Sequence, residues 1–199
     1  GYVTQMLYLF LFLFARLIKK IHIWFIEGIV IGSTLLAFYA LLQANGLEIF
    51  TRDLTRMHWI VPFATFGNPN FFGAYLVLIL PWHLYLILFK HKLYAYFTYA
   101  LVFYVLLINM TRSAWIGYLA TLLFAGSMQF IFKHPLKKRA LLSVISLSLA
   151  LILFYNLSSN QALLGRFLTI SSDFTALVKN EGNLDTLGSF RLFIWIRVI

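Results

Sequence analysis

Long apolar runs separated by short polar segments dominate the chain. A membrane-spanning helix needs about 20 mainly apolar residues. Five runs of about this length predict complete spans over residues 21–43, 70–89, 93–110, 114–132 and 140–157. Shorter runs over 2–15 and 189–199 predict spans truncated at the two ends of the chain, and 158–188 predicts one long outer loop. The pattern therefore predicts an all-α, polytopic transmembrane helix bundle that forms a single domain.

Lysine and arginine gather in alternate connections between these runs. Residues 16–20, 90–92 and 133–139 hold nine basic residues and no acidic residue. The other connections hold five basic residues, which five acidic residues balance. Short cytoplasmic loops carry the excess of Lys and Arg in membrane proteins. We therefore expect the first set of connections in the cytoplasm, and residues 44–66, 111–113 and 158–188 on the outer side.

The composition agrees with a surface that faces lipid. Hydrophobic residues make up 62% of the chain and charged residues 11%, with a mean hydropathy of +0.87. A soluble domain carries about 25% charged residues. The net charge is +10, but the basic residues lie in short loops rather than along one face, so nucleic acid is not an expected partner. The absence of cysteine excludes a disulfide framework and Cys-ligated metal.

Small residues at four-residue spacing indicate where helices approach one another closely. Gly28 and Gly32 form one such pair, and Gly117, Thr121 and Ala125 form a second series on another predicted helix. Residues of this size let helix backbones pack tightly in lipid. We expect both series to lie at contacts between helices.

Three further residues stand out within or beside the spans. Pro81 lies inside the span 70–89 and is expected to kink it, because proline removes a backbone hydrogen bond. Glu27 lies inside the span 21–43, where a carboxylate is a functional candidate by default. His22 or a cytoplasmic basic residue could equally neutralise it. His58, in an outer loop, has no assigned role.

Three polar constellations fall at outer helix starts, and the first is Gly67-Asn68-Pro69-Asn70. Asn68 fits the N-cap position and Pro69 the first helical position, while Gly67 permits the turn before them. Capping alone is therefore the leading interpretation. Asn68 and Asn70 are also candidates for substrate binding, in which they position the loop rather than carry out acid–base chemistry.

The second constellation is Thr111-Arg112-Ser113-Ala114-Trp115, in the tightest outer connection. An arginine at the membrane boundary is often a snorkelling anchor. The positive-inside rule gives no reason for an arginine on this side, however, and Thr111 and Ser113 add hydrogen-bond donors. A helix start with arginine and hydroxyls is also a good anion site. The sequence leaves the two interpretations evenly weighted.

The third constellation is Gly188-Ser189-Phe190-Arg191-Leu192-Phe193-Ile194-Trp195. Ser189 can cap the last predicted helix, which places Arg191 in the first turn and Trp195 one turn further on the same face. Arginine in a first helical turn is unfavourable against the helix dipole. A bound anion would reverse this penalty, so Arg191 is a second candidate for anion binding.

The order of these motifs resembles that of the O-antigen ligase and Wzy polymerase superfamily. The resemblance runs from Gln43, through Gly67-Asn68-Pro69-Asn70-Phe71 and the Thr111–Trp115 constellation, to Ser189-Phe190-Arg191 and Trp195, and covers about residues 35 to 199. It implies a multi-pass glycosyltransferase of the bacterial plasma membrane. Such an enzyme takes a glycan from an undecaprenyl-diphosphate carrier at the outer face and transfers it to a lipid, glycan or protein acceptor.

The resemblance also implies roles for particular residues. Arg112 and Arg191 would be the catalytic arginines that engage the lipid diphosphate, and Trp115 and Trp195 would help to bind the substrate beside the polar residues named above. The family carries a functional histidine in an outer loop that would follow Ile199. The sequence shows no acidic cluster with metal-ligand spacing, so we expect a reaction that needs neither metal nor cofactor.

Two other classes of protein remain open from the sequence. The first is a transporter or flippase for a lipid-linked glycan, which would carry polar residues near the bilayer midplane. The second is a non-catalytic membrane subunit, for which capping and anchoring would explain all three constellations. The concentration of polar motifs at outer helix starts favours the enzyme.

Overall fold

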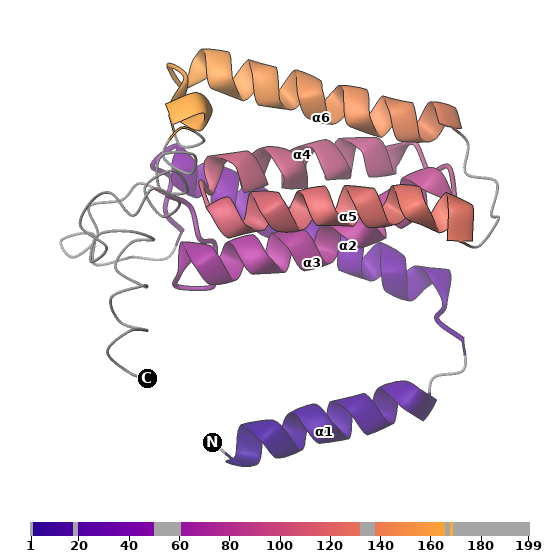
Figure 1. Cartoon of the computed structure of the whole chain (residues 1–199). Coiled ribbons are helices and arrows are strands. Elements are labelled where there is room, and N and C mark those ends of the chain that lie inside the picture. The colour runs from indigo at the N-terminus through magenta and orange to yellow at the C-terminus, as the bar shows by residue number, and fades with distance from the viewer. Residues whose placement is uncertain (1, 18–19, 50–60, 132–137, 166–167, 169–199) are drawn as a thin grey trace, which may run out of the picture.

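The computed structural model is all-helical over the residues that it describes, which are 2–17, 20–49, 61–131, 138–165 and 168. The helices in this part of the chain are α1 (Tyr2–Leu17), α2 (Ile23–Ala44), α3 (Pro69–Leu88), α4 (Tyr94–Ile108), α5 (Arg112–Ile131) and α6 (Lys138–Ser158) (Figure 1). Each begins and ends within two residues of a predicted run. The predicted span 189–199 and most of the loop 158–188 lie outside the described residues.

Within the described residues, three helices are long and apolar enough to cross a membrane, namely α2, α3 and α6. Helix α4 is apolar but has only 15 residues, because the turn at Asn109 and Met110 ends it at Ile108. The structure thus confirms the all-helical class and three helices capable of spanning. That α4 and α5 also cross a membrane stays a prediction.

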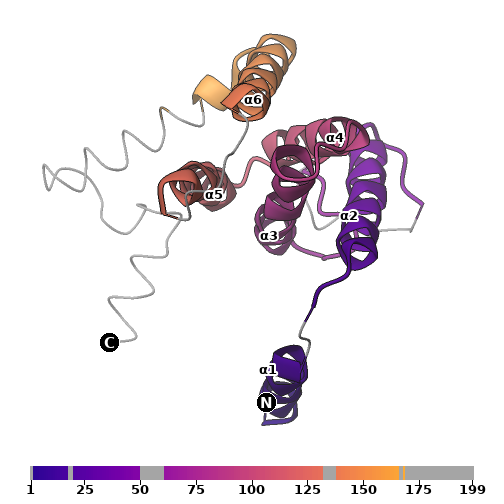
Figure 2. The same ribbon diagram turned by 90° about the vertical axis from the view of Figure 1, so that its right-hand side faces the viewer.

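Helices α2 to α6 lie side by side and run alternately in opposite directions (Figure 1). Helix α3 packs against α4 and α5, α2 packs against α3 and α4, and α6 packs against α4. Viewed along the helices, α2, α3 and α4 form one group, with α5 and α6 on one side of it and α1 apart from it (Figure 2). We call the end where α3 and α5 begin the outer end, after the sequence prediction, and the opposite end the inner end.

The apolar core lies where α3 and α4 meet their neighbours. Its largest fully buried side chains include Phe72, Leu76, Leu80, Tyr99, Phe103 and Leu106. These residues follow three- and four-residue spacing along α3 and α4, so one stripe of each helix is buried. The core therefore holds α3 and α4 against each other along most of their length.

Only one of the two small-residue series lies at a helix contact. At Gly117 of α5, an added Cβ would come 3.0 Å from a methyl group of Val77 on α3, so the expected close approach is confirmed there. The expectation for Gly28 and Gly32 is wrong within the described structure, since both are exposed and an added Cβ would meet no atom within 4 Å. The reason is that α2 buries a different stripe, which includes Ile26 and Val30.

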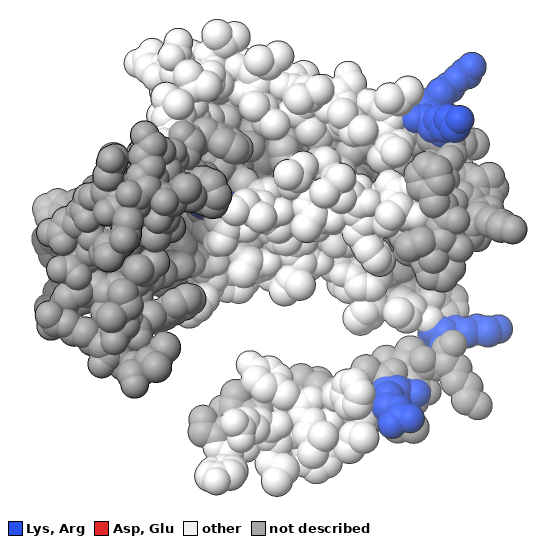
Figure 3. Space-filling model, viewed as in Figure 1, with Lys and Arg blue, Asp and Glu red and all other residues white. Residues whose placement is uncertain are grey.

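At the inner end, Glu27 joins α2 to the start of α4. Its carboxylate accepts a hydrogen bond of 2.9 Å from the Tyr94 hydroxyl and lies 3.7 Å from the Lys92 ammonium group. Glu27 is therefore paired with Lys92, a basic residue of the connection that was predicted to be cytoplasmic, and this pairing is one of the outcomes expected from the sequence. The visible Lys and Arg side chains gather mainly at this end of the molecule (Figure 3).

Candidate functional site at the outer end

The first constellation forms a helix cap. The Asn68 side chain accepts a hydrogen bond of 2.8 Å from the Asn70 backbone N–H, and Pro69 is the first residue of α3. Gly67 has a φ of +69°, in the left-handed region that favours glycine. The capping interpretation is therefore confirmed. The side chain of Asn70 is exposed at the outer surface.

Two buried amides hold the segment that leads into α3. At the end of α2, Gln43 Oε1 accepts hydrogen bonds from the backbone N–H groups of Ala64 (2.8 Å) and Phe63 (3.3 Å), and its Nε2 donates to the Ala64 carbonyl at 3.1 Å. At the end of α4, Asn109 Nδ2 donates to the Pro62 carbonyl at 3.0 Å and to the Pro69 carbonyl at 3.1 Å. The two side chains thus bond to the backbone of this segment at Pro62, Phe63, Ala64 and Pro69.

Asn109 was missed by the sequence analysis, although a signal for it exists. A single amide directly follows the apolar run of α4 and precedes the Thr111–Trp115 constellation. Met110, the next residue, has a φ of +54°, which is uncommon for a residue with a side chain. This conformation closes the turn so that α5 begins at Arg112. Thr111 Oγ1 then donates to the Pro69 carbonyl at 3.3 Å, so the second constellation touches the first.

Helix α5 presents two different faces. Ala114 and Gly117 pack close to α3, at Gly73 and Val77 respectively. Arg112, Trp115, Ile116, Leu119 and Leu122 lie on the other face, at the three- and four-residue spacing of one helix stripe. Arg112 is therefore directed to a different side of α5 from the residues that contact α3.

The Arg112 face lines an apolar groove of about 650 Å³ between α4, α5 and α6. Helix α4 contributes Phe103, Leu106 and Leu107 to its wall, and α5 contributes Arg112, Trp115, Ile116, Tyr118, Leu119 and Leu122. Helix α6 contributes Ile145, Ser148, Leu149, Ile152, Leu153 and Asn156, and Leu163 and Leu164 follow beyond its end. Arg112 and Asn156 lie at the outer end of the groove. A half-buried cation thus borders a long apolar surface.

Trp115 and Ser113, also of the second constellation, lie in the groove wall and at the surface respectively. Trp115 Nε1 donates a hydrogen bond of 3.2 Å to the Leu106 carbonyl in the last turn of α4, which ties α5 to α4. The same indole forms part of the groove wall. Ser113 is exposed in the first turn of α5, next to Arg112. The structure therefore gathers Arg112 and Trp115 on the groove, with Ser113 at the surface beside it.

Three buried hydroxyl groups meet beside the groove. Tyr99 of α4, Tyr118 of α5 and Ser148 of α6 hydrogen-bond to one another, with the Ser148 hydroxyl 2.6 Å from that of Tyr99 and 2.9 Å from that of Tyr118. Ser148 also donates to the Val144 carbonyl at 2.8 Å. Buried hydroxyls in apolar surroundings need such partners. The hydroxyl cluster joins the three helices that form the groove.

The third constellation lies outside the described residues. The candidates Ser189, Arg191 and Trp195 therefore stay predictions, and the same applies to His58.

The fold and the site together define an all-helical protein with helices capable of spanning a membrane and an arginine at the mouth of an apolar groove. Searches against protein-family models, curated proteins and solved structures gave no match to this chain.

Proposed function

We propose that the chain is a membrane-embedded glycan ligase of the O-antigen ligase type, a multi-pass protein of a bacterial plasma membrane. In this proposal, all five helices from α2 to α6 cross the bilayer, with the Arg112 end outside. The substrate is a glycan on an undecaprenyl-diphosphate carrier. The acceptor is a lipid, a glycan or a protein.

The observation that carries the proposal is the position of Arg112 at the outer end of the apolar groove. From Arg112 to Leu122 the groove follows eleven residues of α5, which span about 15 Å at the helical rise. This length is half of a hydrocarbon core about 30 Å thick. A lipid whose headgroup meets Arg112 would therefore place its first carbons along the groove, within the outer leaflet.

The chemistry of the headgroup fits an arginine better than a lysine. A guanidinium group can donate two parallel hydrogen bonds to phosphate oxygens, and it keeps its charge in apolar surroundings. At the first residue of α5, a positive side chain opposes the helix dipole, which favours negative charge at this position. A bound diphosphate would interact favourably with both the dipole and Arg112.

In the proposed reaction, the acceptor oxygen or nitrogen bonds to the anomeric carbon while the bond from this carbon to the diphosphate breaks. The diphosphate leaves with the bonding electron pair, and Arg112 stabilises the charge that develops on it. The acceptor proton passes to a base. Arg191 and a histidine beyond Ile199, both implied by the family resemblance, are the proposed remaining groups.

The first test measures binding of undecaprenyl diphosphate to the purified chain. We expect Arg112→Ala to weaken binding by about 10- to 100-fold, because a charged hydrogen bond to phosphate is lost. Arg112→Lys should recover part of the affinity. Arg139→Ala is the matched control, since Arg139 is exposed at the inner end. Equal binding by the wild type and Arg112→Ala would refute the proposed role.

A second test separates transfer from transport. In the whole protein, Arg112→Ala should lower glycan transfer by about 100-fold or more, as expected for the loss of a preorganised charge. Two deeper features favour the alternative of a flippase, namely the hydroxyl cluster and the fully buried His83, whose Nε2 has no hydrogen-bond partner within the described residues. Movement of the lipid-linked glycan across a liposome membrane without product formation would support the flippase.

A further inference from the structure

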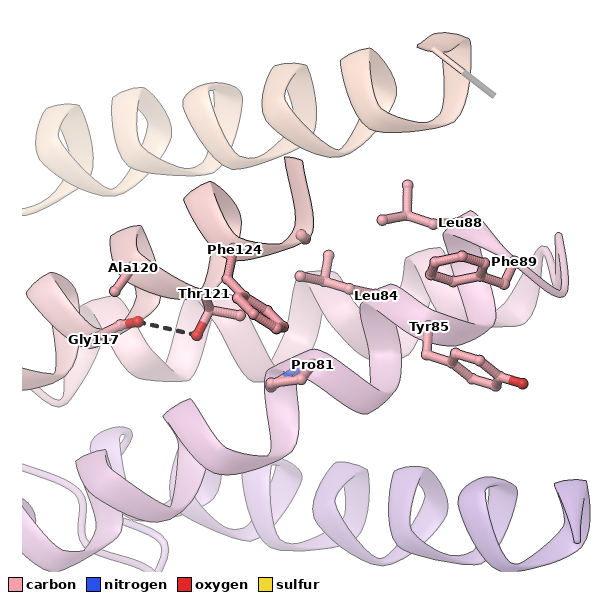
Figure 4. Close-up of a pocket in the computed structure, with 10 residues that line it drawn as sticks. Pro81, Leu84, Tyr85, Leu88, Phe89, Gly117, Ala120, Thr121 and Phe124 are labelled. Atoms are coloured by element: carbon pink, nitrogen blue, oxygen red, sulfur yellow. Dashed lines mark hydrogen bonds between the residues drawn. The ribbon is translucent and has the colours of Figure 1, made fainter. Parts of the chain in front are cut away.

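A second apolar crevice lies between α3 and α5, on the other face of α5 from the groove. It has a volume of about 450 Å³. Its residues are Pro81, Leu84, Tyr85, Leu88 and Phe89 on the α3 side, and Gly117, Ala120, Thr121, Phe124 and Ala125 on α5 (Figure 4). Each side spans nine residues, or about 12 Å at the helical rise. The crevice therefore lies in the inner half of α3 and beside the middle of α5.

Local sequence explains why α3 and α5 leave this space. At the outer side of the crevice the two helices touch, where Val77 lies against Gly117. Further toward the inner end, α5 presents the small residues Ala120, Thr121 and Ala125, so little side-chain volume fills the gap. Thr121 donates its hydroxyl to the Gly117 carbonyl at 3.0 Å (Figure 4). The surface offered to an occupant is therefore almost wholly apolar.

A positive charge lies beside one of the aromatic residues that line the crevice. Lys90 follows Phe89 directly in the chain, and its ammonium group lies 5.8 Å from the centre of the Tyr85 ring. This is a cation–π distance, so the aromatic ring holds the charge beside the crevice wall. Lys92, the next basic residue, lies instead against Glu27 at the α2–α4 contact. Lys90 is thus the basic residue of this loop that lies beside a residue of the crevice wall.

We propose that this crevice binds one chain of an anionic phospholipid of the inner leaflet, with Lys90 meeting the phosphate headgroup. The length of the crevice matches the inner half of the hydrocarbon core, and its wall matches an acyl chain. The charge beside its wall selects an anionic headgroup over a zwitterionic one. The site lies away from Arg112 and does not depend on glycan transfer.

The experiment measures bound lipid on the purified 199-residue chain by native mass spectrometry. Phosphatidylglycerol and phosphatidylcholine with identical acyl chains are the probes. The wild type should bind phosphatidylglycerol about five-fold more tightly, as expected for one basic residue near an anionic headgroup. Lys90→Gln should abolish this preference. Lys138→Gln removes another exposed charge at the inner end and should leave the preference unchanged.

A second pair of variants tests the crevice itself. Ala120→Phe places a large ring in the crevice and should reduce binding of both lipids by about ten-fold or more. Ala150→Phe makes the same change at an exposed position of α6 that lines neither cavity, and should have no effect. An unchanged lipid preference in Lys90→Gln would overturn the headgroup assignment. Equal binding by all variants, or a dimer that excludes lipid, would overturn the site.

Discussion

The contact between Gly73 and Asn109 offers the sharpest test of the outer end. An added Cβ at Gly73 would lie 2.8 Å from Asn109 Oδ1, 3.1 Å from Thr111 Cβ and 3.2 Å from Ala114 Cβ. Asn109 cannot retreat freely, because its Nδ2 donates to both the Pro62 and Pro69 carbonyls. Replacement of Gly73 by alanine must therefore move α3 away from α5 or break one of these hydrogen bonds.

The size of the effect follows from three contributions. Overpacking of a tight contact costs about 1 to 3 kcal/mol, and the loss of one net hydrogen bond costs about 1 kcal/mol. The higher helix propensity of alanine returns about 1 kcal/mol. We therefore expect Gly73→Ala to lower the free energy of unfolding by about 2 kcal/mol. The same shift should weaken lipid-diphosphate binding, since Arg112 follows Thr111.

The assay is unfolding of the purified chain in mixed micelles with increasing denaturing detergent, followed by the loss of helical circular dichroism. Gly32→Ala is the matched control, because Gly32 is also helical but has no atom within 4 Å of an added Cβ. It should be neutral or slightly stabilising. If Gly73→Ala and Gly32→Ala unfold at the same detergent fraction, the close contact at the outer end does not exist.

Three further predictions use the same chain. Ser148→Ala removes a hydrogen-bond partner from Tyr99 and Tyr118 and should lower the free energy of unfolding by about 1 kcal/mol in the same assay. Ser146→Ala, at an exposed position of the same helix, should leave it unchanged. Asn68→Ala should lower the free energy of unfolding by about 1 kcal/mol, because the helix cap is lost. Asn68→Asp should keep the cap but weaken lipid-diphosphate binding by charge repulsion. Full binding by Asn68→Asp would leave capping as the sole role of this residue. A cysteine replacing Asn45 should react with an impermeant thiol reagent outside the cell and one replacing His91 should not, and the reverse result would invert the topology.

The sequence predicted the helices well because each is a long apolar run that ends in polar residues. The N-cap at Asn68 was also predictable, since the cap depends only on residues near it in the chain. The partner of Glu27 was open from the sequence because Lys92 lies on a different helix. The face of α2 was predicted wrongly at Gly28 and Gly32, since glycine spacing alone does not say which side of a helix meets its neighbours.

The candidate site was predicted in part. Arg112 was singled out because the positive-inside rule does not explain an arginine in a connection predicted to be on the outer side. This argument uses only the residues of that connection. The groove beside it depends on which helices become neighbours, and the chain contains no short-range signal for that choice. Asn109 has a visible position directly after the apolar run of α4, but its partners are backbone carbonyls about 40 residues earlier in the chain, and these could not be read from the sequence.

Helix α5 separates the outer groove from the inner crevice, so binding in one cavity is linked thermodynamically to binding in the other. A lipid in the inner crevice would press on the face that carries Thr121, while a lipid in the outer groove would press on the face that carries Arg112. Any displacement of α5 by one ligand changes the space left to the other. By reciprocity, the factor by which an anionic phospholipid alters the affinity for a lipid diphosphate must equal the factor by which the diphosphate alters the affinity for the phospholipid. The lipid composition of the inner leaflet would then tune binding at the outer face.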